Sequence, residues 1–172
     1  MPCTRSLPRR LSLVLSVGLV IRPAKKTDLE KIVALNRSCL PENYSIEFFE
    51  NLLDNYGEFF LVAEEEDRLV GYVMCRLELG MSMTRAFGVV RKGHVVSLAV
   101  DKLRRRQGIG YELMQEVLRR MKAAELKECF LEVRVNNEPA IKLYEKLGFK
   151  VARRASAYYS DGTDGYIMVL PL

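Results

Sequence analysis

The sequence predicts a single α/β domain, of the α+β kind, with a mixed, mostly antiparallel sheet and about four helices. Its 172 residues, 49% hydrophobic and 28% charged, are typical of one soluble globular domain with its own core. Segments with strand and helix periodicity alternate along the chain, without a repeat or a second-domain boundary. Between His94 and Met121 a strand, a glycine-rich loop and an amphipathic helix follow one another, and this unit is expected to organise the fold.

Residues 1–17 are predicted to form a flexible extension, and residues 18–172 the domain. Arg9-Arg10 and the apolar run Leu11 to Ile21 imitate a secretory signal. The run is too short to span a bilayer, and no small-residue cleavage site separates it from Ile21-Arg22-Pro23, the expected end of the first strand. An extension is therefore favoured over a signal peptide.

Two helices and a hairpin are expected next. Thr27-Asp28-Leu29-Glu30 has the pattern of a capping box, which starts a helix that Pro41 ends. A second short helix is expected before the turn Asn55-Tyr56-Gly57. The expected ranges are Ile46 to Leu53 for this helix, Phe59 to Ala63 for a strand, Glu64 to Arg68 for a hairpin turn, Leu69 to Leu79 for the return strand, and Gly80 to Arg91 for a loop.

The central unit begins with the strand His94 to Val100. In the helix that follows, an apolar residue recurs every fourth position, at Ile109, Leu113, Val117 and Met121. The loop between them leads into a helix N-terminus, where unpaired N–H groups and the macrodipole favour an anion. Gly108 and Gly110 let a bulky phosphate approach the main chain, and Arg104 to Arg106 lie beside them. The unit therefore predicts a polyphosphate ligand.

The last third of the chain supplies the remaining elements. The strand Cys129 to Val135 should lie parallel to the central strand, by the right-handed crossover rule. A helix follows from Pro139 to Gly148. Two closing strands, Phe149 to Tyr158 and Tyr166 to Leu170, should flank the turn Asp161 to Gly165.

The glycine-rich loop fits neither familiar nucleotide loop. Gly110 is followed by Tyr111-Glu112 instead of the Lys-Ser/Thr pair of a P-loop, and the dinucleotide fingerprint needs a third glycine. Arg105 to Gly110 instead match the Arg/Gln-x-x-Gly-x-Gly/Ala signature of the GNAT superfamily of N-acetyltransferases. In that family the loop amides hold the pyrophosphate of coenzyme A.

Four further motifs resemble N-terminal protein acetyltransferases, in particular the archaeal enzyme and its eukaryotic counterpart, the catalytic subunit of NatA. The resemblance covers about residues 20–172 and departs from the relatives at Gly165, where they often carry alanine. The motifs are Leu40-Pro41-Glu42-Asn43-Tyr44, His94 to Val100, Arg134-x-x-Asn137-x-x-Ala140-x-x-Leu143-Tyr144, and Tyr158-Tyr159-Ser160-Asp161-Gly162.

This resemblance implies a GNAT fold whose two central parallel strands splay apart and take the pantetheine arm of acetyl-CoA between them. Asn137 also precedes a predicted helix, so capping that helix is an alternative to contacting the cofactor. The residues that the resemblance assigns to acetyl-CoA are Leu98, Ala99, Val100, Arg105, Arg106, Gln107, Gly108, Ile109, Gly110, Tyr111, Asn137, Tyr144, Glu145 and Lys146.

Two charged side chains are candidates for proton transfer. Glu132 lies in a strand of a parallel pair, where charged residues are disfavoured. Either it orders a water that relays the proton of the substrate amine, or it forms an ion pair, with Arg134 on the same face or across to a neighbouring strand. His94 is the only histidine, and histidine is the side-chain type whose ordinary pKa lies near neutrality, so it could share the relay or serve as a structural hydrogen-bonding group.

The resemblance gives roles to residues at the two ends of the reaction. It places the Tyr144 hydroxyl near the coenzyme A sulfur, where it can protonate the departing thiolate, with core packing as the alternative. It places Glu42 at the peptide entrance, where it helps to orient the amine; a solvated carboxylate is the alternative. The walls of the peptide slot would be Leu40, Pro41, Tyr44, Tyr158 and Tyr159.

The predicted function is transfer of the acetyl group of acetyl-CoA to the α-amino group of protein N-termini, during translation and by direct attack in a ternary complex. No metal is required, although His94 and Glu132 could trap a divalent ion. Widely spaced cysteines without a CxxC pair indicate the cytoplasm. The net charge of +5 suits an anionic cofactor and contact with ribosomal RNA, or is only a well-solvated surface.

The expected partners are N-termini of nascent or short polypeptides and the ribosome, with no sequence-specific nucleic acid and no membrane; the chain is expected to be a monomer or weak homodimer. Three other functions stay open. They are a ribosomal-protein alanine N-acetyltransferase with one folded target, a histone-like lysine acetyltransferase, and a non-catalytic coenzyme A-binding adaptor on the ribosome. Tyr158-Tyr159 should narrow the slot against an internal lysine, and an adaptor has no need of Glu42, Glu132 and Tyr144 together.

Overall fold

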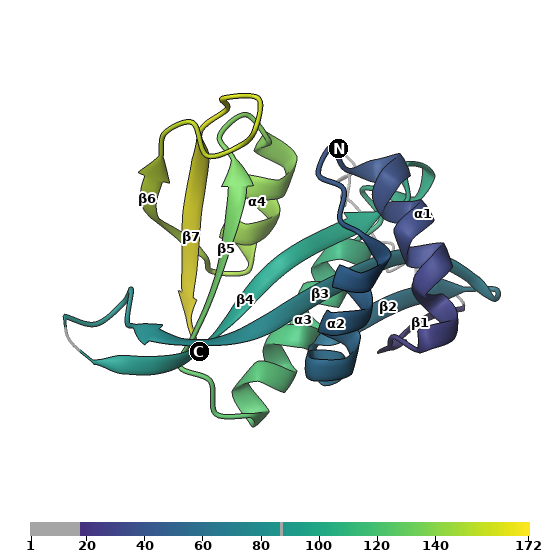
Figure 1. The fold of residues 1–172 in the computed structure, drawn as a ribbon, viewed down its shortest axis with the longest axis horizontal. Coiled ribbons are helices and arrows are strands. Elements are labelled where there is room, and N and C mark those ends of the chain that lie inside the picture. Colours follow the sequence, from purple (N-terminus) through teal and green to yellow (C-terminus); the bar gives the residue numbers. More distant parts are fainter. Residues whose placement is uncertain (1–17, 87) are drawn as a thin grey trace, which may run out of the picture.

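The computed structural model describes residues 18–86 and 88–172, so the predicted extension of residues 1–17 lies outside the described residues. Seven strands and four α-helices form one sheet with helices on both faces (Figure 1). The elements are β1 (Leu19–Pro23), α1 (Leu29–Cys39), α2 (Ile46–Tyr56), β2 (Phe60–Glu65), β3 (Arg68–Met81), β4 (Val89–Val100), α3 (Ile109–Ala123), β5 (Glu128–Arg134), α4 (Glu138–Lys146), β6 (Lys150–Ala155) and β7 (Gly165–Pro171).

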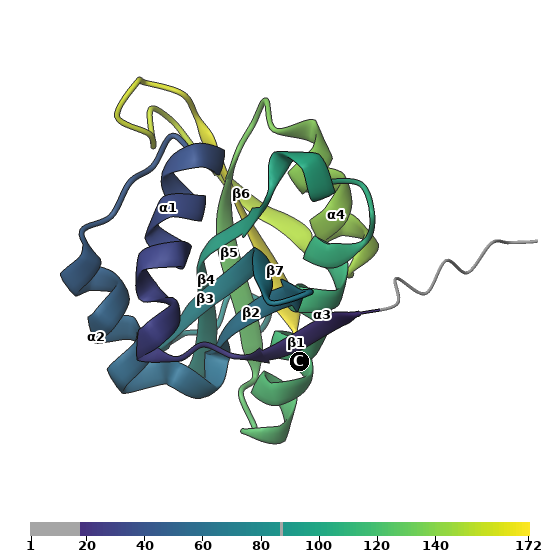
Figure 2. The same cartoon turned by 90° about the vertical axis from the view of Figure 1, so that its right-hand side faces the viewer.

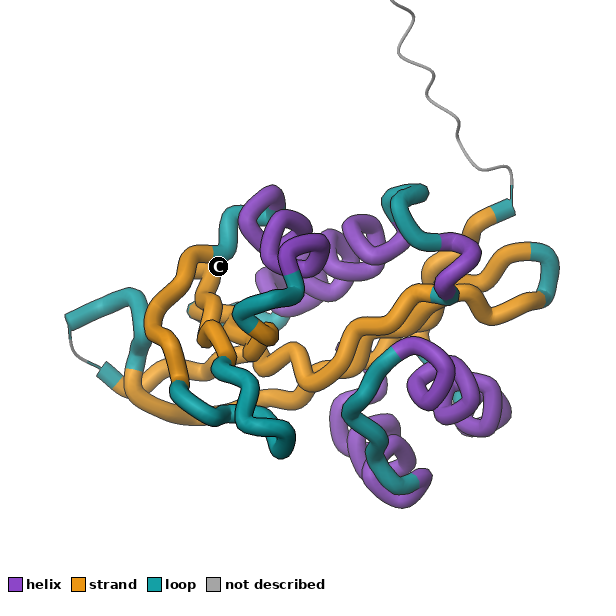
Figure 3. Tube along the Cα trace, turned by 90° about the horizontal axis from the view of Figure 1, so that it is seen from above, coloured by secondary structure: helices purple, strands orange, loops and turns teal. Residues whose placement is uncertain are grey.

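The sheet order is β1-β2-β3-β4-β5-β7-β6, and β4 with β5 is its one parallel pair in the described chain. This confirms the predicted mixed, mostly antiparallel sheet. Helices α1 and α2 cover one face, and α3 and α4 cover the other (Figures 2 and 3). No helix among the described residues combines the length and the apolar character needed to cross a membrane.

Each face of the sheet has its own hydrophobic core. The predicted stripe of α3, including Leu113, Val117 and Met121, is fully buried against the sheet. On the other face, Ile32 of α1 and Phe49 of α2 are equally inaccessible to solvent. Burying one such side chain contributes roughly 1.5–3 kcal/mol, so the two cores hold the sheet rigidly between the helix layers.

The start of α1 differs from the predicted capping box. A 3-10 turn over Lys26–Asp28 precedes the helix, whose N-cap is Asp28, and no side chain caps it. The Asp28 carboxylate instead accepts hydrogen bonds from the Lys25 N–H at 2.8 Å and from Arg22 Nη1 at 2.7 Å. The capping box therefore closes between Lys25 and Asp28, two residues earlier than predicted, and Arg22 of β1 engages the same carboxylate.

The loop predicted over Gly80 to Arg91 is too long, because Gly80 and Met81 still belong to β3, and Val89 to Arg91 already belong to β4. Gly80 pairs with Val90, and the hairpin turns only between Met81 and Val89. The Glu128 carboxylate accepts hydrogen bonds from the Met83 and Thr84 N–H groups, at 2.9 and 3.0 Å. A residue of β5 therefore orders the tip.

The first closing strand is also shorter than predicted. Strand β6 ends at Ala155, because the chain turns at Ala157, whose φ is 48°. The Ala157 N–H donates to the Asp164 carboxylate at 2.8 Å, which fixes this turn. Residues 156–164 are therefore a loop, and this loop contains Tyr158 and Tyr159.

The two central strands splay apart, as the resemblance implied. Strand β4 pairs with β5 only from Lys92 to Val95. The register of β3 and β4 then shifts by one residue, which makes Val96 a β-bulge that bends β4 away from β5. Because the Asp101 N–H donates to the Val70 carbonyl, strand alternation turns the backbone groups of Leu98 and Val100 away from β3 and into the gap.

Candidate active site

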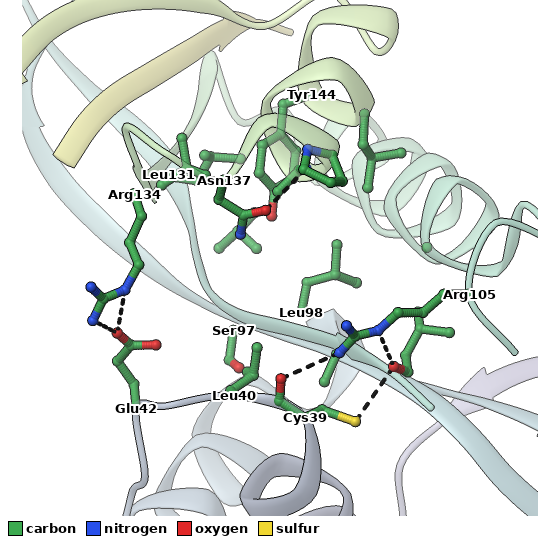
Figure 4. A pocket seen from close by; sticks show the side chains of 18 of the residues that line it. Cys39, Leu40, Glu42, Ser97, Leu98, Arg105, Leu131, Arg134, Asn137 and Tyr144 are labelled. Carbon is green, nitrogen blue, oxygen red and sulfur yellow. Dashed lines mark hydrogen bonds and ion pairs between the residues drawn. The ribbon is translucent and has the colours of Figure 1, made fainter. Parts of the chain in front are cut away.

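A cavity of about 870 Å³ occupies the gap between β4 and β5. It is walled by both strands, by the N-terminus of α3, by α4, and by the α1–α2 and β6–β7 loops (Figure 4). Of the predicted site residues, all line this cavity except His94, Gln107 and Glu145. The motifs that lie far apart in the sequence thus meet around one space.

One end of the cavity is the N-terminus of α3. Gly108 is the N-cap, with a φ of 88°, and no side chain caps the helix. The first intrahelical bond runs from the Glu112 N–H to the Gly108 carbonyl at 3.0 Å, so the N–H groups before Glu112 have no acceptor within the helix. A Cβ on Gly110 would project between Leu143 and Val100, which both line the cavity. These features fit a pyrophosphate at this end.

The arginines of the loop have different partners. Arg105 donates from Nε to the Val100 carbonyl at 3.1 Å and from Nη2 to the Cys39 carbonyl at 3.3 Å, which ties the end of α1 to β4 (Figure 4). Arg104 pairs with Glu65, and its buried Nε has no hydrogen-bond partner among the described residues. Arg106 forms no ion pair within the described chain, so its charge is available to an anion in the cavity.

Asn137 and Tyr144 come into the cavity from α4 (Figure 4). The Asn137 side chain accepts a hydrogen bond from the Ala140 N–H at 3.4 Å, so it caps the helix while it lines the cavity. The Tyr144 ring packs edge-on against Phe149, and burial raises the pKa of its hydroxyl. The hydroxyl is therefore protonated at neutral pH and is a possible proton donor.

Glu132 and His94 form one hydrogen-bonded unit. His94 Nε2 lies 2.7 Å from Glu132 Oε2, and His94 Nδ1 lies 3.1 Å from Glu78 Oε1. The imidazole stacks on Phe130 with ring centroids 4.4 Å apart. Glu132 lines the cavity whereas His94 stands behind it. Of the two predicted pairings, the cross-strand one is formed, between Glu132 and His94, and the Glu132–Arg134 pair is not.

Arg134 bridges the two loops at the other end of the cavity, and Figure 4 shows its contact with Glu42. Its Nη2 lies 2.6 Å from Glu42 Oε1 on the α1–α2 loop, and its Nη1 lies 2.7 Å from Asp161 Oδ2 on the β6–β7 loop. The guanidinium carbon also lies 4.1 Å from the centre of the Tyr159 ring. The sequence predicts only an ion pair for Arg134, with Glu132 or across strands, and gives it no place in the site, although the Arg134-x-x-Asn137 motif includes it.

Buried polar groups hold Glu42 in place, and the sequence interpretation missed them. Asn36 Nδ2 donates to the Glu42 carbonyl at 2.9 Å, and the Tyr72 hydroxyl donates to Asn36 Oδ1 at 2.6 Å. The same hydroxyl lies 2.8 Å from Ser97 Oγ on β4. This chain of contacts links the α1–α2 loop to the bulged strand. No local signal distinguishes these residues from ordinary core and helix positions.

Tyrosines approach Glu132 from both loops. Burial raises the pKa of Tyr44, and the charges of Glu42 and Glu132 raise it further. Burial followed by the charge of Glu132 also raises the pKa of Tyr158, which packs edge-on against Tyr159. The space in front of Glu132 is therefore a narrow slot with phenol walls.

The cavity is electrically asymmetric. Its two lining carboxylates, Glu42 and Glu132, lie at the slot, with Arg134 between the loops. The other lining cations, all at the α3 end, are Lys102, Arg104, Arg105, Arg106 and Lys146. One mouth thus attracts an anion and the other a small cation. Within residues 18–86 and 88–172, no group of three or more His, Cys, Asp or Glu side chains is arranged to hold a metal ion.

Comparison with known proteins gives consistent matches. The model of the acetyltransferase (GNAT) family matches residues 29–149. The chain is 47% identical over 154 residues to the N-alpha-acetyltransferase of Sulfurisphaera tokodaii, covering 88% of this chain and 92% of that protein. It is 34% identical over 152 residues to N-alpha-acetyltransferase 30 of Schizosaccharomyces pombe, covering 88% and 97%. A chain in the crystal structure of the NatC complex bound to Gag peptide and CoA superimposes with a TM-score of 0.82 at 26% identity, covering 90% and 99%.

Proposed function

This chain belongs to the GNAT family of acetyltransferases, and we propose that it transfers the acetyl group of acetyl-CoA to the α-amino group of nascent protein N-termini. The observation that carries the proposal is the asymmetric cavity: a basic helix N-terminus at one mouth and a narrow slot with two carboxylates at the other. Its relatives are named as Nα-acetyltransferases, and the chain is accordingly an acetyl-CoA-dependent acyltransferase. This sets aside a non-catalytic adaptor.

The α3 end is suited to the diphosphate of coenzyme A. The free N–H groups after Gly108 supply donors, and Arg106 and Lys146 supply charge. The backbone of Leu98 and Val100 faces the gap, where it can pair with the amides of a pantetheine arm as a neighbouring strand would. When bound, acetyl-CoA supplies the acetyl thioester at the narrow end.

At the slot, the substrate ammonium must lose a proton before it can attack. The pKa of an α-amino group is about 7.7–8.0, so a carboxylate and one water suffice as a relay at neutral pH. Glu132 lines the cavity, and His94 holds its carboxylate by a 2.7 Å contact from behind. We therefore assign the relay to Glu132 and the positioning of its carboxylate to His94.

Two further side chains complete the reaction. The Tyr144 hydroxyl, which burial keeps protonated, donates to the departing sulfur. Glu42 is held by Arg134 and Asn36 at the entrance, where its carboxylate can orient the incoming ammonium. The neutral amine would then attack the acetyl carbonyl directly, and the C–S bond would break. Of the two protons that the nitrogen loses, one would leave through Glu132 before the attack, and the second would replace the proton that Tyr144 gives to the departing sulfur.

The shape of the slot favours a chain terminus over an internal lysine. Arg134 connects the two loops across the entrance, so a substrate must pass beside it instead of lying in an open groove. Tyr44 and Tyr158 narrow the same space from opposite loops. This supports varied short N-termini as substrates and disfavours one large folded target such as a ribosomal protein.

A peptide panel tests the proposal. Short peptides that vary in the first two residues are assayed with acetyl-CoA, next to N-terminally blocked peptides that carry a lysine. We expect turnover with several free N-termini and no turnover with the blocked peptides. Activity confined to one alanine-starting ribosomal sequence, or to the blocked lysine peptides, would overturn it.

Action during translation and residence in the cytoplasm are part of the same proposal. The exposed cations of the chain and its acceptance of short N-termini are consistent with work beside the ribosome as a monomer or weak homodimer. Co-sedimentation with ribosomes that carry nascent chains should exceed that with empty ribosomes. Equal co-sedimentation would argue against recruitment by the nascent chain.

A further inference from the structure

The β3–β4 hairpin projects well beyond the rest of the sheet (Figures 1 and 3). Strand β2 stops pairing with β3 at Met74, so β3 continues from Cys75 to Met81 with only β4 as a neighbour in the described chain. We call the described residues 77–86 and 88–93 the arm. One edge of its strand β3 therefore presents backbone N–H and C=O groups that no other strand uses.

The arm exposes apolar side chains on a single face. Leu79 is 73% exposed, Met81 58% and Val89 60%. Leu79 and Met81 are two residues apart on one strand, and Met81 is directly opposite Val89, so the three side chains lie together. Soluble proteins seldom leave such a cluster open unless it meets a partner.

The arm is nevertheless held firmly. The Glu128 carboxylate receives four hydrogen bonds from Ser82, Met83 and Thr84 at the tip. Lys92 Nζ donates to the Met81 carbonyl at 2.8 Å, and the Lys127 N–H donates to the Arg91 carbonyl at 3.0 Å. A surface that is already ordered loses little entropy when a partner binds.

Charge indicates what the partner must carry. Residues 79–91 contain Arg85 and Arg91 and no carboxylate. Both arginines are exposed, and neither forms an ion pair with a carboxylate in the described part of the chain. Two copies of the arm would bring these like charges together, which disfavours a second copy of this chain as the occupant.

We propose that the arm is a docking surface for an acidic protein segment, which adds to the open edge of β3 as a strand. Its apolar side chains would cover Leu79, Met81 and Val89, and its flanking Asp or Glu residues would pair with Arg85 and Arg91. The surface lies outside the cavity, so docking leaves the acetylation of short peptides intact. The inference does not depend on the proposed substrate.

A binding experiment with designed probes tests this. The probes are two fluorescent 12-residue peptides, one alternating Glu with Val or Leu and the other alternating Lys with the same residues. We expect the acidic peptide to bind and the lysine peptide not to bind. Leu79→Glu should weaken binding about 30-fold or more, and Arg91→Ala about fivefold. Val20→Glu places the same charge on an exposed apolar position of β1 and should have no effect.

Each variant is also assayed for acetylation of a short peptide, which should stay at the wild-type rate. Equal binding of both probes, or binding that Leu79→Glu leaves unchanged, would overturn the proposal. Analytical ultracentrifugation tests whether the chain dimerises through the arm. A dimer that Leu79→Glu dissociates would show that a second copy occupies the arm, and would also overturn it.

Discussion

His94 Nε2 lies 2.7 Å from Glu132 Oε2, and only Glu132 reaches the wall of the cavity. The sequence suggested that either residue could relay a proton through ordered water. The structure instead arranges them in series, since His94 meets the cavity only through Glu132. Residues that act as one unit have non-additive effects when they are removed.

The first prediction follows from this arrangement. Glu132→Gln should lower kcat by about 10²–10⁴-fold, and His94→Ala by less. The double variant should be no slower than Glu132→Gln alone. Turnover is measured at saturating acetyl-CoA and peptide, with folding checked by circular dichroism. A double variant far slower than either single variant would instead support two independent relays.

The second prediction concerns the phosphate mouth. Gly108→Glu places a negative charge where the helix N-terminus is proposed to hold pyrophosphate, so coenzyme A affinity should be lost. The φ of 88° also costs any other residue about 1–2 kcal/mol in strain. Gly108→Asn is the matched control, because asparagine tolerates this conformation without charge. Calorimetry should show that Gly108→Asn binds coenzyme A and that Gly108→Glu does not. If Gly108→Glu binds coenzyme A with unchanged affinity, this loop does not hold the pyrophosphate.

The third prediction concerns the leaving group. Tyr144→Phe should lower kcat by about 10–100-fold and leave coenzyme A affinity nearly unchanged, because the ring still packs against Phe149. Burial raises the pKa of the Tyr144 hydroxyl, so it stays protonated from pH 6 to 9 and the defect should be constant over this range. Tyr56→Phe, at the end of α2, is the control. A defect that disappears as the pH falls would contradict the assignment.

The fourth prediction concerns stability against acid. Burial raises the pKa of Glu128, but hydrogen bonds from Met83, Ser82 and Thr84 outweigh it and lower the pKa to about 2, from an ordinary 4.5. A depressed folded-state pKa means that the stabilisation is present above about pH 4.5 and is lost as the pH falls toward 2. The ionised Glu128 carboxylate therefore contributes about 3 kcal/mol to the free energy of unfolding at neutral pH.

Glu128→Gln should therefore lower the free energy of unfolding at pH 7 and flatten its dependence between pH 4.5 and pH 2. Urea unfolding at several pH values measures both effects. Glu30→Gln, at an exposed position on α1, should change neither. If Glu128→Gln keeps the full acid dependence of the wild-type protein, other carboxylates hold the hairpin.

The parts of the fold that the sequence predicted are those with strong local patterns. The fourfold spacing on α3 and the glycine loop before it predicted the central unit, and the parallel strand after it followed from connection handedness. The length of the β3–β4 hairpin could not be predicted, since it depends on Glu128, more than 40 residues away. The predicted capping box failed for a more local reason, because the Asp28 carboxylate is held by the Lys25 N–H and by Arg22 at the end of β1.

The candidate site shows a similar division. Motif residues such as Glu42, Asn137 and Tyr144 were identified and meet around the cavity. The pairing of Arg134 with Glu42 could not be predicted, because the two residues lie 92 positions apart in the sequence and only the fold brings them together. The sequence also could not predict that Glu132 lines the cavity and His94 does not. Strand alternation predicts which face of the sheet a side chain is on, but not whether the side chain reaches the cavity.

The central claim is that the slot takes a free α-amine and excludes an internal lysine. The most direct test is one peptide that carries both amines, incubated with acetyl-CoA and mapped by tandem mass spectrometry. The acetylation found in a reaction without enzyme is subtracted, because the lower pKa of the α-amine already favours its acetylation over that of the lysine side chain. We expect enzyme-dependent acetylation at the first residue, and acetylation of the lysine side chain only at the level found without enzyme. Predominant acetylation of the lysine would contradict it.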